Sequence, residues 1–161
     1  MNKLNKIVPV VVLLAVVGLV GVSFMQMRAT PPAEQASQSY EISTADDLEK
    51  IERENGKVNI YFFWGNGCPH CAEEFEFFKN IEPGYGDKYN LYTFETWYND
   101  ENSELAKVFA EKMGDELRGV LYTVIGEESF VGFATDYPKR FTDAIETQDQ
   151  KGFDVYLDKI K

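Results

Sequence analysis

Residues 60–71 read IYFFWGNGCPHC, a run that passes from apolar and aromatic residues through a short glycine-containing turn to two cysteines. Apolar residues fill both alternating faces from Val58 to Trp64, which is typical of a central strand covered by helices on each side. Pro69 suits the first position of a helix, because its missing N–H would have no partner there. Both cysteines of the chain and its only histidine lie in this run: Cys68, Cys71 and His70. We therefore expect a buried strand, a turn and a helix that begins with two thiols.

The segments around this run alternate between helical and strand patterns. Helical patterns cover residues 46–55, 69–81, 103–113 and 137–145, and strand patterns cover residues 58–64, 89–97, 120–126 and 129–134. Helices separate the first two strands, which predicts parallel pairing, whereas a two-residue link joins the last two and predicts an antiparallel hairpin. The patterns predict one α/β domain over residues 40–161. Its mixed four-stranded sheet should carry helices on both faces.

Two helix ends depend on proline and glycine. Pro83-Gly84-Tyr85-Gly86 is expected to break the helix that starts at Pro69. An apolar face over residues 153–160 predicts another helical segment, either separate or a continuation of the last helix past Gly152.

The N-terminal part of the chain has the pattern of a membrane anchor. Lys3 and Lys6 precede residues 7–25, which carry no charge. As a helix this segment would span roughly 28 Å, close to the thickness of a bilayer core. We expect residues 1–28 to form a transmembrane signal anchor, and residues 29–39 to form a polar, proline-containing linker.

The charge around the apolar segment predicts its orientation. Basic residues before it place the N-terminus in the cytoplasm and the domain outside. A cleaved signal peptide is the alternative, with a passable cleavage site at Gly21-Val22-Ser23. Either interpretation exports the domain to a compartment that is usually oxidising.

The net charge of −11 limits the classes of partner. Only one of the 27 acidic residues but three of the 16 basic residues precede residue 40, so the domain is more acidic than the whole chain. Such a surface repels phosphate backbones, and nucleic-acid binding is not expected. The acidic surface favours solubility, with steering of cationic partners as the second interpretation.

The tetrapeptide Cys68-Pro69-His70-Cys71 at a helix start is typical of a redox dithiol. The sulfur of Cys68, at the N-cap, would face free backbone N–H groups and the positive end of the helix dipole, and both favour the thiolate. His70 would add a donor, and when protonated a positive charge. We therefore expect Cys68 to be the nucleophile and Cys71 the resolving thiol. Glu73, Glu74 and Glu76 are expected to point to solvent.

Three other interpretations of the tetrapeptide were weighed. A zinc site needs about four ligands, and the chain offers two cysteines and one histidine. A purely structural disulfide across so short a loop would constrain little unfolded-state entropy. His70 could also be a packed histidine without a redox role. A redox dithiol is favoured, and it needs neither a cofactor nor a metal.

Residues 46–159 resemble the thioredoxin-like thiol–disulfide oxidoreductases. The tetrapeptide is that of the DsbA-type disulfide oxidases, but only residues 98–102 separate the second strand from the next helix, which leaves no room for their helical insertion. A compact domain behind an anchor looks more like the bacteriocin transport accessory proteins and similar surface proteins of Gram-positive bacteria. The resemblance implies the thioredoxin fold.

The chain departs from this family's pattern at two positions. The family carries a buried acid, which accepts a proton from the resolving thiol, six positions before the first cysteine, where this chain has Phe62. The family also carries a cis-proline where this chain has Leu121, and Val120 precedes it. A cis bond before a residue other than proline costs about 2.5–4 kcal/mol, so Leu121 would have either a trans bond or a strained cis bond.

The expected function is that of a membrane-anchored extracytoplasmic oxidoreductase. It would oxidise the thiols of exported proteins or peptides through a mixed disulfide on Cys68, and exchange electrons with a redox partner at the membrane or surface. A reductase, or a binding module for peptide export, are the alternatives. An apolar surface that holds polypeptide substrates is expected around the dithiol, from Trp64, Val120, Leu121 and Phe133.

Overall fold

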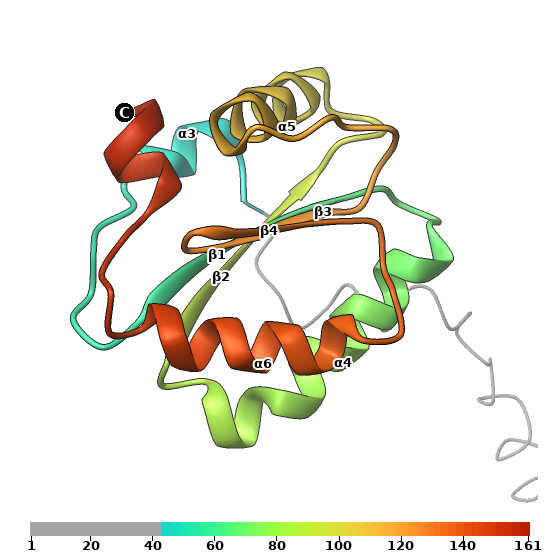
Figure 1. The fold of residues 1–161 in the computed structure, drawn as a ribbon. Coiled ribbons are helices and arrows are strands. Elements are labelled where there is room, and N and C mark those ends of the chain that lie inside the picture. Colours follow the sequence, from blue (N-terminus) through green and yellow to red (C-terminus); the bar gives the residue numbers. More distant parts are fainter. Residues whose placement is uncertain (1–42) are drawn as a thin grey trace, which may run out of the picture. The chain divides into compact units, whose positions relative to one another are not determined.

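The computed structural model describes residues 43–161, and its elements follow one another in the predicted order (Figure 1). They are α3 (Ala45–Leu48), β1 (Val58–Trp64), α4 (Pro69–Tyr85), β2 (Tyr89–Glu95), α5 (Asp100–Met113), β3 (Tyr122–Ile125), β4 (Glu128–Val131), α6 (Tyr137–Gln148) and the π-helical turn η2 (Tyr156–Ile160). The anchor expected at residues 1–28 and the linker expected at 29–39 lie outside the described residues. Among the described residues, no helix is both long and apolar enough to cross a bilayer.

β1 is a central strand of a four-stranded sheet with the order β2-β1-β3-β4. It pairs with β2 in parallel along its whole length, from Val58 opposite Tyr89 to Trp64 opposite Glu95. β3 is antiparallel to β1, and β4 is antiparallel to β3. The predicted mixed sheet, with parallel first strands and an antiparallel hairpin at one edge, is therefore confirmed.

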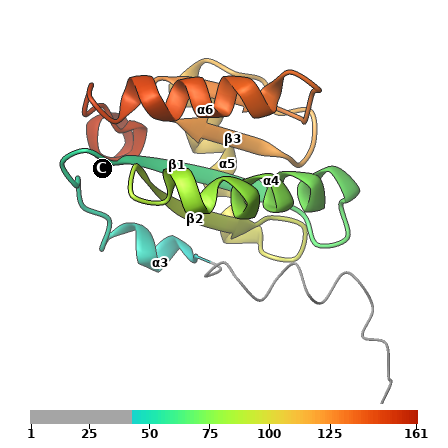
Figure 2. The ribbon, with the colours of Figure 1, turned by 90° about the horizontal axis from the view of Figure 1, so that it is seen from below.

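Side chains of β1 alternate between two cores, one on each face of the sheet. Ile60, Phe62 and Trp64 pack in the core that α4 and α6 cover. Tyr61 and Phe63 pack in the core that α3, α5 and η2 cover. Figure 1 shows the two layers of helices on opposite faces, and Figure 2 shows the face with α4 and α6. All seven residues of β1 are buried, as the apolar run predicts.

The N-terminal helix is only one turn long, so the prediction of a helix to residue 55 is wrong beyond Leu48. The side chain of Asn59, buried on β1, donates from Nδ2 to the carbonyl of Glu52 (3.3 Å). This carbonyl therefore bonds to the strand instead of to a following helical turn. The helical pattern of residues 46–55 does not indicate this bond, because Asn59 belongs to the following strand.

One helix ends elsewhere than predicted, and the C-terminal helical segment is separate from the helix before it. Pro83 lies inside α4, which continues to Tyr85, because one proline near a helix end removes only one backbone hydrogen bond. Residues 156–160 form a separate helical segment, η2, and not a continuation of α6, because Gly152 has a left-handed backbone (φ +67°) in the turn between them. Asp154 then accepts hydrogen bonds from the hydroxyl of Tyr61 (2.9 Å) and the amide of Asn59 (2.7 Å), which holds the C-terminal segment on β1.

Candidate active site

Cys68 and Cys71 lie at the start of α4, directly after the turn that follows β1. Cys68 is the N-cap residue with extended backbone, and Pro69 occupies the first turn. The backbone N–H of Cys71 donates to the sulfur of Cys68 (3.3 Å). Both cysteines are free thiols, and Cys68 is partly exposed whereas Cys71 is only 1% exposed. The sulfur of Cys68 is therefore accessible to a substrate, whereas the sulfur of Cys71 is not.

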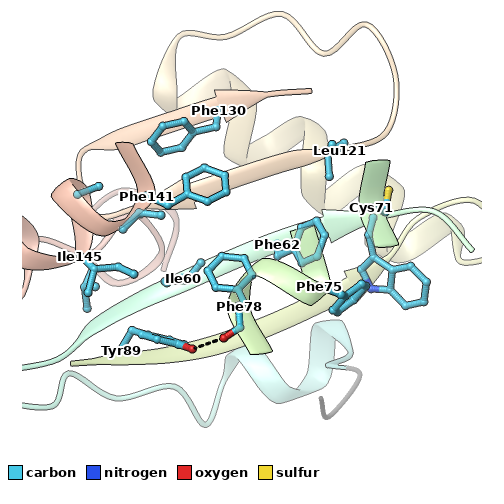
Figure 3. Close-up of a cluster of buried hydrophobic side chains, with 14 residues drawn as sticks. Ile60, Phe62, Cys71, Phe75, Phe78, Tyr89, Leu121, Phe130, Phe141 and Ile145 are labelled. Carbon is cyan, nitrogen blue, oxygen red and sulfur yellow. Dashed lines mark hydrogen bonds between the residues drawn. The ribbon is translucent and has the colours of Figure 1, made fainter. Parts of the chain in front are cut away.

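The environment of Cys71 keeps its thiol protonated. Burial raises the pKa of Cys71 far above its usual range, and the contact with the Cys68 side chain raises it further. Figure 3 shows Cys71 in one apolar cluster with Phe62, Phe75 and Leu121. Cys71 can therefore form a thiolate only if a neighbouring group takes its proton.

His70 is exposed, and its ring contacts Glu73 on the surface of α4. Its Nδ1 lies 3.0 Å from a carboxylate oxygen of Glu73, one helical turn further on. The imidazole is 66% exposed. The hydrogen-bond partner of the ring is thus Glu73 and not the sulfur of Cys68, which corrects the expected position of this donor. The i, i+3 spacing on a helix surface explains the pair.

Glu74 does not point to solvent, and this expectation is wrong. Its side chain is fully buried, and one carboxyl oxygen accepts the hydroxyl hydrogen of Thr123 on β3. Its other oxygen, Oε2, has no hydrogen-bond partner within residues 43–161. Burial raises the pKa of Glu74 from 4.5 to about 8, although the bond from Thr123 opposes this. Glu74 is therefore mostly a neutral acid at pH 7.

Glu74 lies one helical turn after the resolving thiol. When ionised, its negative charge raises the pKa of Cys71, although less than burial and the contact with Cys68 do. Phe62, at the position where the family carries its acid, is fully buried and packs on Phe75 with ring centroids 4.8 Å apart. The strand therefore supplies no acid here, whereas α4 carries a buried acid in Glu74.

A signal for Glu74 was present in the sequence. Cys71, Glu74 and Phe78 follow one another at spacings of three and four residues, so they share one face of α4. Since Cys71 and Phe78 are expected to face the core, the residue between them is expected there too. The neighbouring Glu73 and Glu76 are exposed, as predicted. Because all three residues are glutamates, composition alone does not separate the buried one from the exposed ones.

The expected apolar surface around the dithiol is wrong for two of its members. Trp64 is 8% exposed and Leu121 is 2% exposed, so both side chains belong to the core. The ring of Trp64 packs edge-on against Phe75 with centroids 5.2 Å apart. Val120 and Phe133 are half-buried. Trp64 and Leu121 thus pack beneath the site and do not form its surface.

Leu121 has a trans peptide bond, since no described residue has a cis bond. Its backbone is left-handed (φ +86°), and it is the one described residue other than glycine with a positive φ. A β-carbon makes this conformation costly, by about 1–2 kcal/mol. Packing of the leucine side chain in the core offsets this cost. The backbone that would face a substrate therefore differs from that of a cis-proline loop.

We expect Leu121→Pro to lower the free energy of unfolding by at least about 3 kcal/mol. The proline ring requires φ near −65°, which is incompatible with +86°, and the leucine side chain is lost from the core. Urea denaturation of the reduced protein measures the change in the free energy of unfolding. Leu121→Met is the matched control and should change stability by less than about 1.5 kcal/mol. Unchanged stability of Leu121→Pro would contradict the left-handed conformation.

Comparison with known proteins finds only distant structural similarities. No protein-family model matches the chain, and no curated protein matches it. Among solved structures, the chain is similar to the thioredoxin of Malassezia sympodialis, with 23% identity over 67% of this chain and 88% of that one, and a TM-score of 0.47. An uncharacterised thioredoxin-like protein of Clostridium perfringens shows 18% identity over 63% and 79%, with a TM-score of 0.45. A putative thiol:disulfide interchange protein DsbE of Chlorobium tepidum shows 14% identity over 59% and 82%, with a TM-score of 0.43.

The fold is thioredoxin-like. The order β2-β1-β3-β4, the pairing directions and the helices on both faces carry this assignment. The similarities to solved structures are too distant to carry an activity. Within residues 43–161, no three side chains of the metal-binding types converge. The reactive side chains at the start of α4 are Cys68, Cys71 and the buried Glu74.

Proposed function

We propose that the domain is a thiol–disulfide oxidoreductase that oxidises the thiols of exported proteins or peptides. The observation that carries the proposal is the arrangement of the two sulfurs. Cys68 is partly exposed at the N-cap of α4 and accepts a backbone N–H, whereas Cys71 is buried directly behind it. An accessible sulfur that helix N–H groups stabilise is both a good nucleophile and a good leaving group.

The reaction starts from the Cys68–Cys71 disulfide. A substrate thiolate attacks the sulfur of Cys68, the Cys68–Cys71 bond breaks, and the electron pair leaves on Cys71. A second substrate thiolate then attacks the substrate sulfur of the mixed disulfide and releases Cys68 as a thiolate. The substrate loses two electrons and two protons, and the cysteine pair of the enzyme gains two electrons. A membrane or surface redox partner that carries a disulfide restores the Cys68–Cys71 bond by the same exchange.

Glu74 supplies the proton for the buried leaving group. Cys71 leaves as a thiolate inside an apolar cluster, where a charge is costly. Burial holds Glu74 as a neutral acid near pH 7, and its Oε2 has no competing partner among the described residues. Transfer of this proton to Cys71 moves the negative charge to the carboxylate of Glu74, which is also buried but accepts the hydrogen bond from Thr123. A proton must then reach Glu74 before the next turnover.

The position of the domain in the cell is part of the proposal. The uncharged segment at residues 7–25 and the preceding lysines support a single-pass anchor with the domain outside the membrane. A role like that of the bacteriocin transport accessory proteins fits a compact domain on such an anchor. Its substrates would then be exported polypeptides rather than cytoplasmic ones.

Two other functions remain as alternatives with their own support. A reductase uses the same sulfurs, with Glu74 accepting the proton of Cys71 instead of donating it. A binding module for peptide export is favoured by Leu121, because the backbone beside the dithiol lacks the cis-proline conformation. The direction of electron flow distinguishes the reductase from the oxidase. The absence of any thiol exchange would identify the binding module.

The test is a single-turnover oxidation of a reduced, unfolded protein by the disulfide form of the domain. We expect one substrate disulfide for each Cys68–Cys71 bond reduced. The reduction potential, measured against glutathione, should be clearly more oxidising than about −200 mV. A potential near thioredoxin's own value of about −270 mV would assign the reductase instead. No exchange with either protein or small-molecule thiols would assign the binding module.

A further inference from the structure

A loop that sequence reasoning did not single out lies beside the dithiol. It connects β2 to α5 and presents Trp97 and Tyr98, which are 49% and 80% exposed. They are two of the four large apolar side chains that stand out as exposed among the described residues, and they are consecutive. Exposed aromatic pairs are costly in water and are enriched where proteins bind partners.

The carboxylate of Glu95 ties this loop to the turn that carries the dithiol. Its Oε1 accepts the backbone N–H of Asn66 and of Trp97, each at 3.0 Å, and its Oε2 accepts that of Tyr98 at 2.9 Å. Asn66 lies two residues before Cys68 in the turn after β1. Because one carboxylate accepts from both segments, the loop has a defined position relative to the nucleophile.

Trp97 also lies directly against that turn. A β-carbon added to Gly65 would come within 2.4 Å of the indole ring, so the ring covers the backbone of this glycine. The carbonyl of Gly65 in turn accepts the backbone N–H of Cys68 (3.1 Å). The indole is therefore one short turn away from the attacking sulfur, and about half of it remains open to a partner.

The charge around the aromatic pair indicates the chemistry of that partner. Asp100 and Glu101, which follow Tyr98 by two and three residues, are exposed and acidic. No lysine or arginine occurs in residues 65–70 or 95–101. The whole chain carries a net charge of −11. Opposite charge across an interface speeds encounter and sets the register of the partner.

We infer that Trp97 and Tyr98 form an aromatic platform that holds the substrate polypeptide in an extended form while its cysteine reacts with Cys68. The preferred substrate has apolar or aromatic residues and a lysine or arginine close to its cysteine. The inference rests on the proposed function, since it assigns the substrate class of the same site. This platform provides the apolar contact surface for the substrate, which the buried Trp64 and Leu121 cannot provide.

The test compares two reduced dithiol peptides and one small dithiol, all oxidised by the full chain in detergent. One peptide carries Lys and Phe beside its cysteines, the other carries Glu and Ser, and the small dithiol is dithiothreitol. For the wild type we expect kcat/KM to favour the basic aromatic peptide about tenfold or more, with the preference shrinking as salt rises. Trp97→Ala with Tyr98→Ala should remove this preference and leave the rate with dithiothreitol within twofold.

Matched variants separate the platform from other surfaces. Trp97→Phe should keep most of the wild-type preference for the basic aromatic peptide, because an aromatic ring remains over Gly65. Val108→Ala, at an exposed apolar residue of α5, should change nothing. Phe133→Ala tests the shallow groove that Phe133 lines together with Ala72 and Phe77 of α4. If this variant alone loses the preference, substrates bind on that side and the inference is wrong.

The outcomes also separate this inference from the proposed function. If the wild type does not oxidise dithiothreitol, the redox function fails and the platform fails with it. If oxidation of dithiothreitol is normal but the paired alanine variant keeps the peptide preference, only the platform is refuted. If that variant changes the sedimentation of the protein and not the peptide preference, the aromatic pair serves self-association, which also overturns the inference.

Discussion

Replacement of Cys68 by alanine is expected to lower the rate of substrate oxidation at least about 1000-fold, to the uncatalysed background. No other described residue offers a sulfur that is both accessible and at a helix N-terminus, because Cys71 is 1% exposed. The measurement is single-turnover oxidation of a reduced, unfolded protein. Since Cys68 is partly exposed, we expect little change in stability, and circular dichroism checks this.

Replacement of Cys71 by alanine should have a different effect, because it removes the resolving thiol and leaves the nucleophile. Incubated with a polypeptide that contains a disulfide, the variant should accumulate a mixed disulfide, because the Cys68 thiolate attacks the substrate disulfide and no second thiol releases it. The product is visible as a higher-mass band that reductant removes. The matched control is the double variant Cys68→Ala/Cys71→Ala, which should trap nothing. Trapping by the double variant, or full activity of Cys68→Ala, would contradict the assigned roles.

Replacement of Glu74 by glutamine is expected to slow opening of the Cys68–Cys71 disulfide about 100-fold at pH 7. Glutamine keeps the size of the side chain and an acceptor for Thr123, but it has no acidic proton to give to Cys71. Stopped-flow fluorescence can report the step, because Trp64 packs in the same core as Cys71. Glu73→Gln, at an exposed position on the same helix, is the matched control and should stay within about threefold. Equal rates for both variants would mean that water supplies the proton.

The same substitution should change how stability depends on pH. The pKa of Glu74 rises from 4.5 to about 8 on folding, so between these values the folded state holds a proton that the unfolded state has lost. The stability of the wild type should therefore fall with rising pH across this window, by up to about 1.4 kcal/mol per pH unit. Glu74→Gln should lack this contribution. The variant should match the wild type near pH 4 and exceed its stability by about 3 kcal/mol at pH 7, measured by urea denaturation under reducing conditions.

An inverted result would be informative. If the glutamine variant loses stability at all pH values and shows the same slope as the wild type, burial of Glu74 is not the source of the pH dependence. The proton route to Cys71 would then have to pass through another group. The kinetic and the thermodynamic experiment thus test the same buried carboxyl in independent ways.

Local patterns predicted most of the elements but not the positions of all their side chains. The tetrapeptide and its place between strand and helix were readable because Pro69 and the apolar run from Val58 are local signals. The burial of Glu74 was not predicted, because Glu73, Glu74 and Glu76 were treated alike although only Glu74 shares the helix face of Cys71 and Phe78. The exposure of Trp97 was not predicted either, because an aromatic residue after a strand is indistinguishable from a core residue in sequence alone.

The sequence by itself determined the α/β class, the parallel first strands and the two thiols at a helix start, since each depends on residues close together in the chain. Only the tertiary structure decided which of the glutamates is buried, which aromatic side chains remain exposed, and that Leu121 has a left-handed backbone. These features depend on contacts between β3, α4 and the loop after β2, which are far apart in sequence. Burial and electrostatics act through space, so the partners of Cys68 and Cys71 become visible only once those segments are packed together.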